Sequence, residues 1–504
     1  MTYRKEIDGL RALAVISVIL FHVGPKTFSG GFIGVDVFFV ISGYLITSII
    51  LHEHQRDKFS VLHFYERRAR RILPALFFVM AVTFIIAYAW MLPDELKNFG
   101  QSLFATTLFS NNILLAFTAD YWALASEFKP LLHTWSLGVE EQYYVLFPLL
   151  MMLGWKFFRQ YLAVVLGVAA ISSFAAANWG LFNKPEFAFY LLPTRAWEIL
   201  VGALAVFYTI GTKSAHSKYR LSELLGGTGF CLIVLSIFLI GRGHTSHGML
   251  YLAAPTLGTA LIILFSSENT VVGRILGWSP IVGVGLISYS AYLWHQPLFS
   301  MARVYSKEPL GIVIYSLLLV LTLILAYITW RFIETPCRNR EKVSRTAIFS
   351  LALVLSLAFA SCGFYLDRNY GVVSRIYDPS MIKAADLDKR IYNQRVFQKK
   401  KDSFSFDAQL KLLVLGNSFG RDFVNMTTET FDVGNVDIVY RDDFSDCIGP
   451  FANKTAEVLY NAADVIVLAS GNVNVTERCV ADNIRFTRAK KQGAVLCRHE
   501  GFRL

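Results

Sequence analysis

The chain has 504 residues, of which 54% are hydrophobic and only 17% are charged, and its mean hydropathy is +0.46. This composition excludes a disordered chain and a collagen-like chain, and it is not that of an ordinary soluble enzyme. Apolar runs near the length of a bilayer span recur along the sequence. We therefore predict an all-α polytopic membrane bundle as the main part of the fold.

The net charge of +11 does not indicate a nucleic-acid partner. Residues 1–366 carry 28 Lys or Arg against 19 Asp or Glu, whereas residues 367–504 carry 20 against 18. The excess lies in short loops between apolar runs, where it orients a membrane protein. The six cysteines lack the spacing of a metal site, so no metal is expected. A disulfide among Cys447, Cys479 and Cys497 becomes available if the tail is exported.

Twelve apolar segments are candidates for membrane spans: 10–24, 32–51, 72–92, 97–118, 139–155, 161–180, 194–210, 223–241, 249–267, 281–304, 310–333 and 347–366. The segment 97–118 is the most polar of them. If it is left out and the N-terminus is cytoplasmic, the inner loops carry 18 Lys or Arg and the outer loops carry 6. This bias obeys the positive-inside rule. We therefore predict about 11 transmembrane helices, with 97–118 as a re-entrant or interfacial segment and the tail outside the cytoplasm.

The tail has a different character from the bundle. KLLVLGNSFGRDF (411–423) is typical of a strand, a turn and a helix, and VDIVY (436–440) and DVIVLAS (464–470) are further apolar strands. Strands that alternate with helices predict a small α/β domain with a parallel sheet. We divide the chain into a transmembrane domain, a linking helix with the start of a linker, a linker, and a small domain, at residues 1–340, 341–376, 377–410 and 411–504.

Ionisable side chains lie within or at the ends of the apolar segments: Arg11, His22, Asp36, Glu140, Glu141, Arg195, Glu198, His295 and Glu334. Each one alone is equally well explained by an interhelical pair or an interfacial anchor. A charge at mid-bilayer costs roughly 3 kcal/mol, however, and nine such residues in one bundle favour a polar interior site. We expect the wall of this site to contain Asp36, His133, Glu140, Glu141, Arg195, Glu198 and His295.

The first span carries two of these residues, Arg11 and His22. Eleven helical residues separate them by roughly 16 Å along the helix axis, so they are not in contact. A histidine can take a proton from a hydroxyl group near neutral pH, and an arginine near the cytoplasmic face can hold a phosphorylated donor. The pair is compatible with a base at the outer end of the span and a donor contact at its inner end, but an Arg–His pair in a transmembrane helix has no functional meaning by itself.

The inner loop FYERRARRILP (64–74) contains four arginines: Arg67, Arg68, Arg70 and Arg71. The simplest interpretation of this cluster is an orientation signal. It is also dense enough to bind the phosphates of a nucleotide-type donor. Both interpretations stay open from the residues alone.

Seven motifs together are specific: EIDGLRALAVISVILFH (6–22), GGFIGVDVFFVISGYLI (30–46), FYERRARRILP (64–74), HTWSLGVEEQYY (133–144), RAWEILVG (195–202), SYSAYLWHQPL (288–298) and WRFIETPCR (330–338). With them the chain resembles, over nearly its whole length, the acyltransferase-3 family of membrane acyltransferases. The resemblance is to the branch fused to an SGNH-type hydrolase domain, such as bacterial O-antigen acetyltransferases.

This resemblance implies ten core spans plus one linking span in the bacterial inner membrane, surrounded by membrane lipid. It also implies acetyl-CoA or a similar acyl-CoA as cytoplasmic donor. The acceptor would be a hydroxyl group of an extracytoplasmic glycan or lipid-linked polysaccharide, such as lipopolysaccharide O-antigen. The family's Arg–His pattern falls on Arg11 and His22, and its basic motif falls on the four arginines of 64–74.

In the tail, the resemblance places the catalytic nucleophile of the SGNH fold at Ser418 of Gly416-Asn417-Ser418. The family's late Asp-x-x-His pair has no counterpart here. His499 is the only histidine after Lys411, and the residue three before it is Leu496. We therefore expect an incomplete triad, in an SGNH-like domain that is either truncated or has lost its catalytic residues.

A transporter or flippase of a lipid-linked glycan is the alternative function. It would share the many spans and the interior charges, but it would form no acyl product and would not require His22. The full run of motifs favours the acyltransferase, because hydropathy alone does not supply them.

Overall fold

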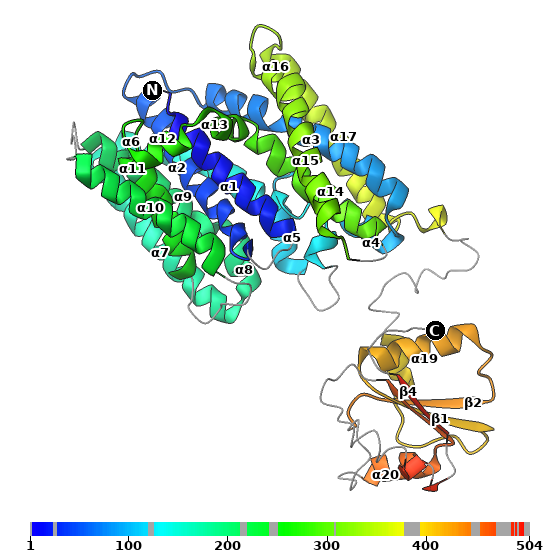
Figure 1. Ribbon diagram of the computed structural model, residues 1–504. Helices are drawn as coiled ribbons and strands as arrows, with labels where there is room; N and C mark the ends of the chain where they lie inside the picture. Colours follow the sequence, from blue (N-terminus) through cyan, green and yellow to red (C-terminus); the bar gives the residue numbers. More distant parts are fainter. Residues whose placement is uncertain are drawn as a thin grey trace. The chain divides into compact units, whose positions relative to one another are not determined.

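Figure 1 shows the two compact units of the computed structural model, Met1–Ile376 and Tyr377–Leu504, which are described separately here. The structure describes residues 3–23, 28–118, 125–211, 219–240, 250–306, 309–376, 394–444, 454–469, 485–487, 489–490 and 493–497.

The first unit is a bundle of helices, as predicted. Its helices are α1 (Lys5–Val23), α2 (Gly34–His54), α3 (Val61–Trp90), α4 (Pro93–Thr107), α5 (Asn111–Thr118), α6 (Thr134–Phe157), α7 (Leu162–Asn183), α8 (Pro185–Tyr190), α9 (Leu192–Gly211), α10 (Tyr219–Leu239), α11 (Leu250–Phe265), α12 (Val271–Leu276), α13 (Ser279–Leu286), α14 (Ser288–Tyr305), α15 (Ile312–Thr329), the π-helix η6 (Trp330–Glu334), α16 (Thr335–Arg338) and α17 (Arg345–Arg368).

Within the described ranges, seven helices are long and apolar enough to cross a membrane: Gly31–His54, Val61–Trp90, Arg159–Asn183, Pro185–Thr209, Arg220–Leu239, Ile312–Arg338 and Arg345–Arg368. The prediction of a multi-pass membrane bundle is confirmed. The other four predicted spans coincide with α1, α6, α11 and α14. Helix α11 has only 16 residues, and the other three carry polar side chains inside the bundle. The count of eleven spans stays a prediction.

Two of the apolar segments are interrupted. The segment 97–118 is not one helix, because α4 ends at Thr107 and α5 begins at Asn111, with Phe109 between them at φ +52°. The segment 281–304, which we expected to be one span, divides into α13 and α14 at Ile287. Helix α14 alone has 18 residues, which gives it a length of roughly 27 Å.

Helices α2 and α9 approach each other closely at two glycines. A β-carbon added at Gly43 would lie 1.8 Å from the carbonyl oxygen of Ile199, and one added at Gly202 would lie 2.0 Å from that of Val40. Small residues of this kind let membrane helices pack backbone against backbone. The contact brings together the buried charged residues of the two helices.

The second unit contains a four-stranded parallel sheet in the order β2-β1-β3-β4. Its elements are β1 (Leu410–Leu415), α19 (Ser418–Thr430), β2 (Val436–Arg441), α20 (Lys454–Ala462), β3 (Val465–Ala469) and β4 (Gly493–Cys497). The predicted small α/β domain with a parallel sheet is confirmed, and β4 is an additional strand that we did not predict.

The faces of this sheet follow the alternation of side chains along β1. Leu413 and Leu415 pack in one cluster with Leu459 of α20, whereas Val414 packs in another with Val424 of α19. The two helices therefore cover opposite faces. The SGNH assignment stays a prediction. His499 of the triad argument lies outside the described ranges, as do Cys447 and Cys479, which were named for a disulfide.

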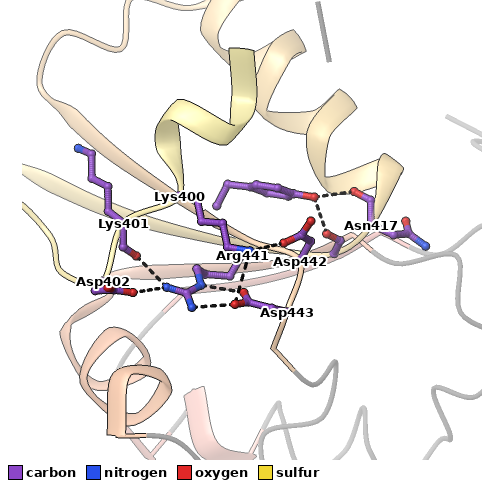
Figure 2. Close-up of polar contacts among 9 residues, drawn as sticks. Lys400, Lys401, Asp402, Asn417, Arg441, Asp442 and Asp443 are labelled. Atoms are coloured by element: carbon purple, nitrogen blue, oxygen red, sulfur yellow. Dashed lines mark hydrogen bonds and ion pairs between the residues drawn. The ribbon is translucent and has the colours of Figure 1, made fainter. Parts of the chain in front are cut away.

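Ion pairs tie the segment before β1 to the sheet (Figure 2). Arg441, the last residue of β2, donates to the carboxylates of Asp402 and Asp443 at 2.5 and 2.8 Å. Lys400 donates to Asp442 at 2.8 Å. The hydrogen bond from Arg441 lowers the pKa of the Asp443 carboxyl below its ordinary value. Residues 394–409 of the predicted linker thus include a part that is held against the sheet.

The predicted topology can be tested by cysteine labelling. Ser403 is exposed in the tail, so a Ser403→Cys protein should react with a membrane-impermeant thiol reagent in intact spheroplasts. Gln55→Cys is the matched control, because Gln55 is exposed at the end of α2 in a predicted cytoplasmic loop. It should react only after permeabilisation, and the unaltered chain sets the background. The reverse pattern would refute the predicted orientation.

Candidate active site

A cavity inside the bundle is lined by Arg11, Val35, Phe38, Phe39, Ile41, Ser42, Leu45, Ile46, Arg68, Arg71, Ile72, Ser136, Leu137, Glu140, Tyr144, Tyr289 and Tyr292. These residues come from α1, α2, α3, α6 and α14, so segments far apart in the sequence build one site. The cavity combines apolar walls with a few charged and hydroxyl groups, which is typical of a small-molecule site.

Three arginines give the cavity its positive charge. Arg11 donates to Asp8 at 3.2 Å on its own helix, and its side chain is largely buried. The guanidinium of Arg68 lies over the ring of Tyr144, 5.6 Å from its centroid. Arg71, one turn further along α3, completes the set. Guanidinium groups that line one cavity are suited to phosphate groups.

Glu140 is the carboxylate of the same cavity. It accepts hydrogen bonds from the hydroxyls of Ser42 at 2.9 Å and Tyr144 at 3.2 Å. Glu141, its neighbour, does not line the cavity, and its Oε1 is buried without a hydrogen-bond partner among the described residues. The structure therefore brings one of the two predicted glutamates into the cavity.

The other two arginines of the basic motif have different partners. Arg67 pairs with Glu53 of α2 at 2.9 Å. Arg70 is buried, pairs with Glu66 at 3.0 Å, and donates to the carbonyl oxygens of Cys337 and Val343. Neither lines the cavity. The motif we took for a loop is helical, since α3 begins at Val61, and only two of its four arginines line the cavity.

Three histidines from distant segments lie side by side. His22 is at the end of α1, His133 directly precedes α6, and His295 is in the middle of α14. The ring centroid of His295 is 5.0 Å from that of His22 and 5.3 Å from that of His133. His133 and His295 are buried, whereas His22 is partly exposed. We call these three residues the histidine cluster.

The tautomer of His22 follows from its backbone contact. Its Nδ1 lies 2.9 Å from the carbonyl oxygen of Val18, which can only accept a hydrogen bond. The hydrogen of the neutral ring is therefore on Nδ1, and the lone pair is on Nε2. Arg303 of α14 donates to the carbonyl oxygen of His22 and so joins the end of α1 to α14.

Tyr292 and Ser136 lie between the cavity and the histidine cluster. Both line the cavity, and their hydroxyls are 2.6 Å apart. The hydroxyl of Tyr292 also donates to the carbonyl oxygen of His133 at 2.9 Å. The ring of Tyr292 is 5.2 Å from that of His295, centroid to centroid. The two polar regions of the bundle are therefore adjacent.

Asp36, Arg195 and Glu198 form a separate buried group. Arg195 pairs with Asp36 of α2 at 2.5 Å and with Glu198 of its own helix at 3.1 Å. Its guanidinium lies over the rings of Phe39 and Trp135. None of the three charged residues lines the cavity, so the structure assigns them to the α2–α9 contact rather than to its wall.

In the tail, Ser418 begins α19 directly after β1 and the turn Gly416-Asn417. Gly416 has φ +148°, and a β-carbon there would lie 1.9 Å from the carbonyl oxygen of Ala469. The hydroxyl of Tyr440 donates to the carbonyl oxygens of Gly416 and Asn417 (Figure 2). The expected strand–turn–helix context of Ser418 is present. Its role as a nucleophile stays a prediction.

Sequence comparison gives the family of the chain. The family model described as "Acyltransferase domain" matches residues 4–331, which contain the whole cavity and the histidine cluster. The chain belongs to this family. No solved structure matches it.

Relatives of this acyltransferase family member are similar over much of its length. The O-acetyltransferase OatA of Staphylococcus aureus is 31% identical over 394 residues, which are 72% of this chain and 64% of that protein. The peptidoglycan O-acetyltransferase OatA of Listeria monocytogenes is 33% identical over 359 residues, 67% of this chain and 56% of that protein. The matched part thus spans less than two thirds of the length of these relatives.

Sequence reasoning missed the hydroxyl groups of the site. Ser42, Ser136, Tyr144 and Tyr292 are common residue types that carry no signal by themselves. Their positions within three of the quoted motifs were the available clue, since two of them fall in HTWSLGVEEQYY and one falls in SYSAYLWHQPL.

Proposed function

We propose that this protein transfers an acetyl group from a cytoplasmic acyl-CoA to a hydroxyl group of an extracytoplasmic glycan. The observation that carries this proposal is the adjacency of two polar regions in one bundle. The arginine-lined cavity and the histidine cluster share Tyr292 and Ser136 as a common wall. Family membership supports acyl transfer as the reaction.

The arginines are assigned to the donor. CoA carries several phosphates and presents its thioester at the end of a long, flexible arm. Arg68 and Arg71 would hold phosphate oxygens, and Arg11 would orient the donor or neutralise its charge. Arg11 and His22 are roughly 16 Å apart along α1, a distance that such an arm must cross to bring the acetyl group toward His22.

His22 is assigned as the general base. Its Nε2 takes the proton of the acceptor hydroxyl while the hydroxyl oxygen attacks the carbonyl carbon of the thioester. A C–O bond forms, the C–S bond breaks, and the proton ends on the sulfur of the released thiol. With the N-terminus in the cytoplasm, His22 lies at the outer end of α1, where an extracytoplasmic glycan arrives.

Two similarities of the chain point to different classes of acceptor glycan. The resemblance to O-antigen acetyltransferases points to lipopolysaccharide, whereas the name of the Listeria relative points to peptidoglycan. We favour peptidoglycan for this chain, because that relative is 33% identical to it. The deciding measurement is NMR of O-acetyl groups in separately purified peptidoglycan and lipopolysaccharide from cells with and without the gene. An unchanged acetyl content in both would refute the proposed function and favour a transporter.

The assignment of the arginines predicts a split within the basic motif. Arg68→Lys and Arg71→Lys keep the charge but lose the planar fork, so each should raise the KM for acetyl-CoA about tenfold. Arg67→Lys is the matched control, since Arg67 faces Glu53 and not the cavity. Its KM should stay at the wild-type value. Equal KM values in all three variants would leave the motif as an orientation signal only.

A further inference from the structure

The histidine cluster contains more basic nitrogen atoms than the proposed reaction uses. His295 is completely buried, and within the described residues its Nε2 has no hydrogen-bond partner. Leaving a buried polar atom unpaired is energetically unfavourable. Packing of the ring against its neighbours gives Nε2 no hydrogen-bond partner, whereas a proton received at Nε2 would use its lone pair.

The protonation state of His295 is fixed in the same way as that of His22. Its Nδ1 lies 2.5 Å from the carbonyl oxygen of Tyr292, one turn back on α14. The neutral ring therefore carries its hydrogen on Nδ1 and its lone pair on Nε2. Both rings thus offer a basic Nε2, and their centroids are 5.0 Å apart. A direct transfer requires the two nitrogens to face each other across this separation.

One charged group lies at the His22 end of the cluster. Arg303 donates to the backbone carbonyl oxygen of His22. His295 lies eight residues before Arg303 on α14, which is roughly 12 Å along the helix axis. His133 and Tyr292 are the other titratable groups whose rings pack against His295.

The other side of His295 leads to the donor cavity. The ring of Tyr292 contacts that of His295, and its hydroxyl is 2.6 Å from that of Ser136. Both hydroxyls line the cavity in which the thioester would lie. His295 therefore stands between the residue that would take up the proton and the place where the leaving sulfur would need it.

We propose that His295 is the second member of a proton relay that begins at His22. This inference rests on the proposed acetyl transfer. The proton moves from the acceptor hydroxyl to Nε2 of His22, then to Nε2 of His295. It continues through the hydroxyls of Tyr292 and Ser136 to the sulfur that leaves when the C–S bond breaks. No further reactant is needed, and His295 acts through His22 without touching the glycan.

The test uses the full chain in proteoliposomes, with acetyl-CoA as donor and either soluble peptidoglycan strands or O-antigen polysaccharide as acceptor. His295→Gln keeps a polar side chain of similar length but cannot carry the proton. We expect kcat to fall roughly 10- to 100-fold, with an unchanged KM for acetyl-CoA. The solvent deuterium isotope effect on kcat should increase, because proton transfer becomes rate-limiting.

Trp294→Phe is the matched control on the same helix. Trp294 donates to Thr329 at 2.9 Å and lies outside the histidine cluster, so its loss should leave kcat and the isotope effect unchanged. A wild-type kcat in His295→Gln would overturn the relay. A fall in kcat with an equal loss of acetyl-CoA binding would also overturn it, since His295 would then be structural. Failure of the wild-type protein to acetylate either acceptor would instead refute the proposed function.

Discussion

His22→Ala is expected to reduce acetylation of the acceptor glycan by about 10²- to 10⁴-fold while the protein remains in the membrane. The reason is that a positioned general base contributes this much to the rate, and alanine has no group that accepts a proton. The imidazole of His22 is oriented by Val18 and lies beside His295. The measurement is the O-acetyl content of the purified glycan at matched protein levels.

His54→Ala is the matched control for this variant. The Nδ1 of His54 contacts the carbonyl oxygen of Ile50, four residues back, as that of His22 contacts Val18. The ring of His54 stacks on that of Phe59, and His54 belongs neither to the cavity lining nor to the histidine cluster. Its loss should leave acetylation unchanged. Normal acetylation by a well-expressed His22→Ala protein would remove His22 from the mechanism.

Arg195→Met is expected to lower the free energy of unfolding by about 3–5 kcal/mol. It leaves the carboxyl groups of Asp36 and Glu198 buried between α2 and α9 without their cation. The effect should appear as a lower midpoint of thermal unfolding of the detergent-solubilised protein. Replacing all three residues, as Asp36→Leu, Arg195→Met and Glu198→Leu, should recover most of the loss, because no unpaired charge then remains.

Arg67→Met tests whether burial is the cause. It also breaks an arginine–carboxylate pair, but the side chains of Arg67 and Glu53 are 33% and 23% exposed. Pairs near the surface contribute about 0–1 kcal/mol, so the unfolding midpoint should hardly change. If Arg195→Met and Arg67→Met unfold at the same temperature, the buried group does not hold α2 and α9 together.

Hydropathy and charge predicted much of this fold, because a bilayer requires apolar spans and favours basic loops on the cytoplasmic side. Each apolar segment of the bundle coincides with one helix or with a pair of short helices. The polar segment 97–118 was set apart by its composition, and it is divided between α4 and α5. In the tail, three apolar runs became parallel strands, whereas GAVLC (493–497), which lies among charged and polar residues, was not identified as a strand.

The site was harder to predict, because pairing between helices leaves no local signal. Arg68 and Arg70 are two residues apart in one motif, yet one lines the cavity and the other is buried against Glu66. Two helical residues are about 200° apart around the axis, so these side chains point to different sides of α3. Glu66, on the side of Arg70, also pairs with Arg345 of α17 at 2.9 Å. Only the packed structure identifies the partner of each arginine, because Arg67 and Arg71 are neighbours on the helix surface and yet only Arg71 lines the cavity.

Helices α1, α6 and α14 are not among the seven described helices that are long and apolar enough to cross a membrane, and they carry or adjoin the histidine cluster and its hydroxyl partners. Each of them alone would expose costly polar groups to lipid. Helix α14 is synthesised long after α1, so during translation the polar face of α1 has to be sheltered by α2 or by the insertion machinery. Chains that end before α14 are therefore expected to be less stable in the membrane and to be degraded early by membrane proteases. In this protein, the packing of α14 against α1 both assembles the histidine cluster and removes its polar groups from contact with lipid.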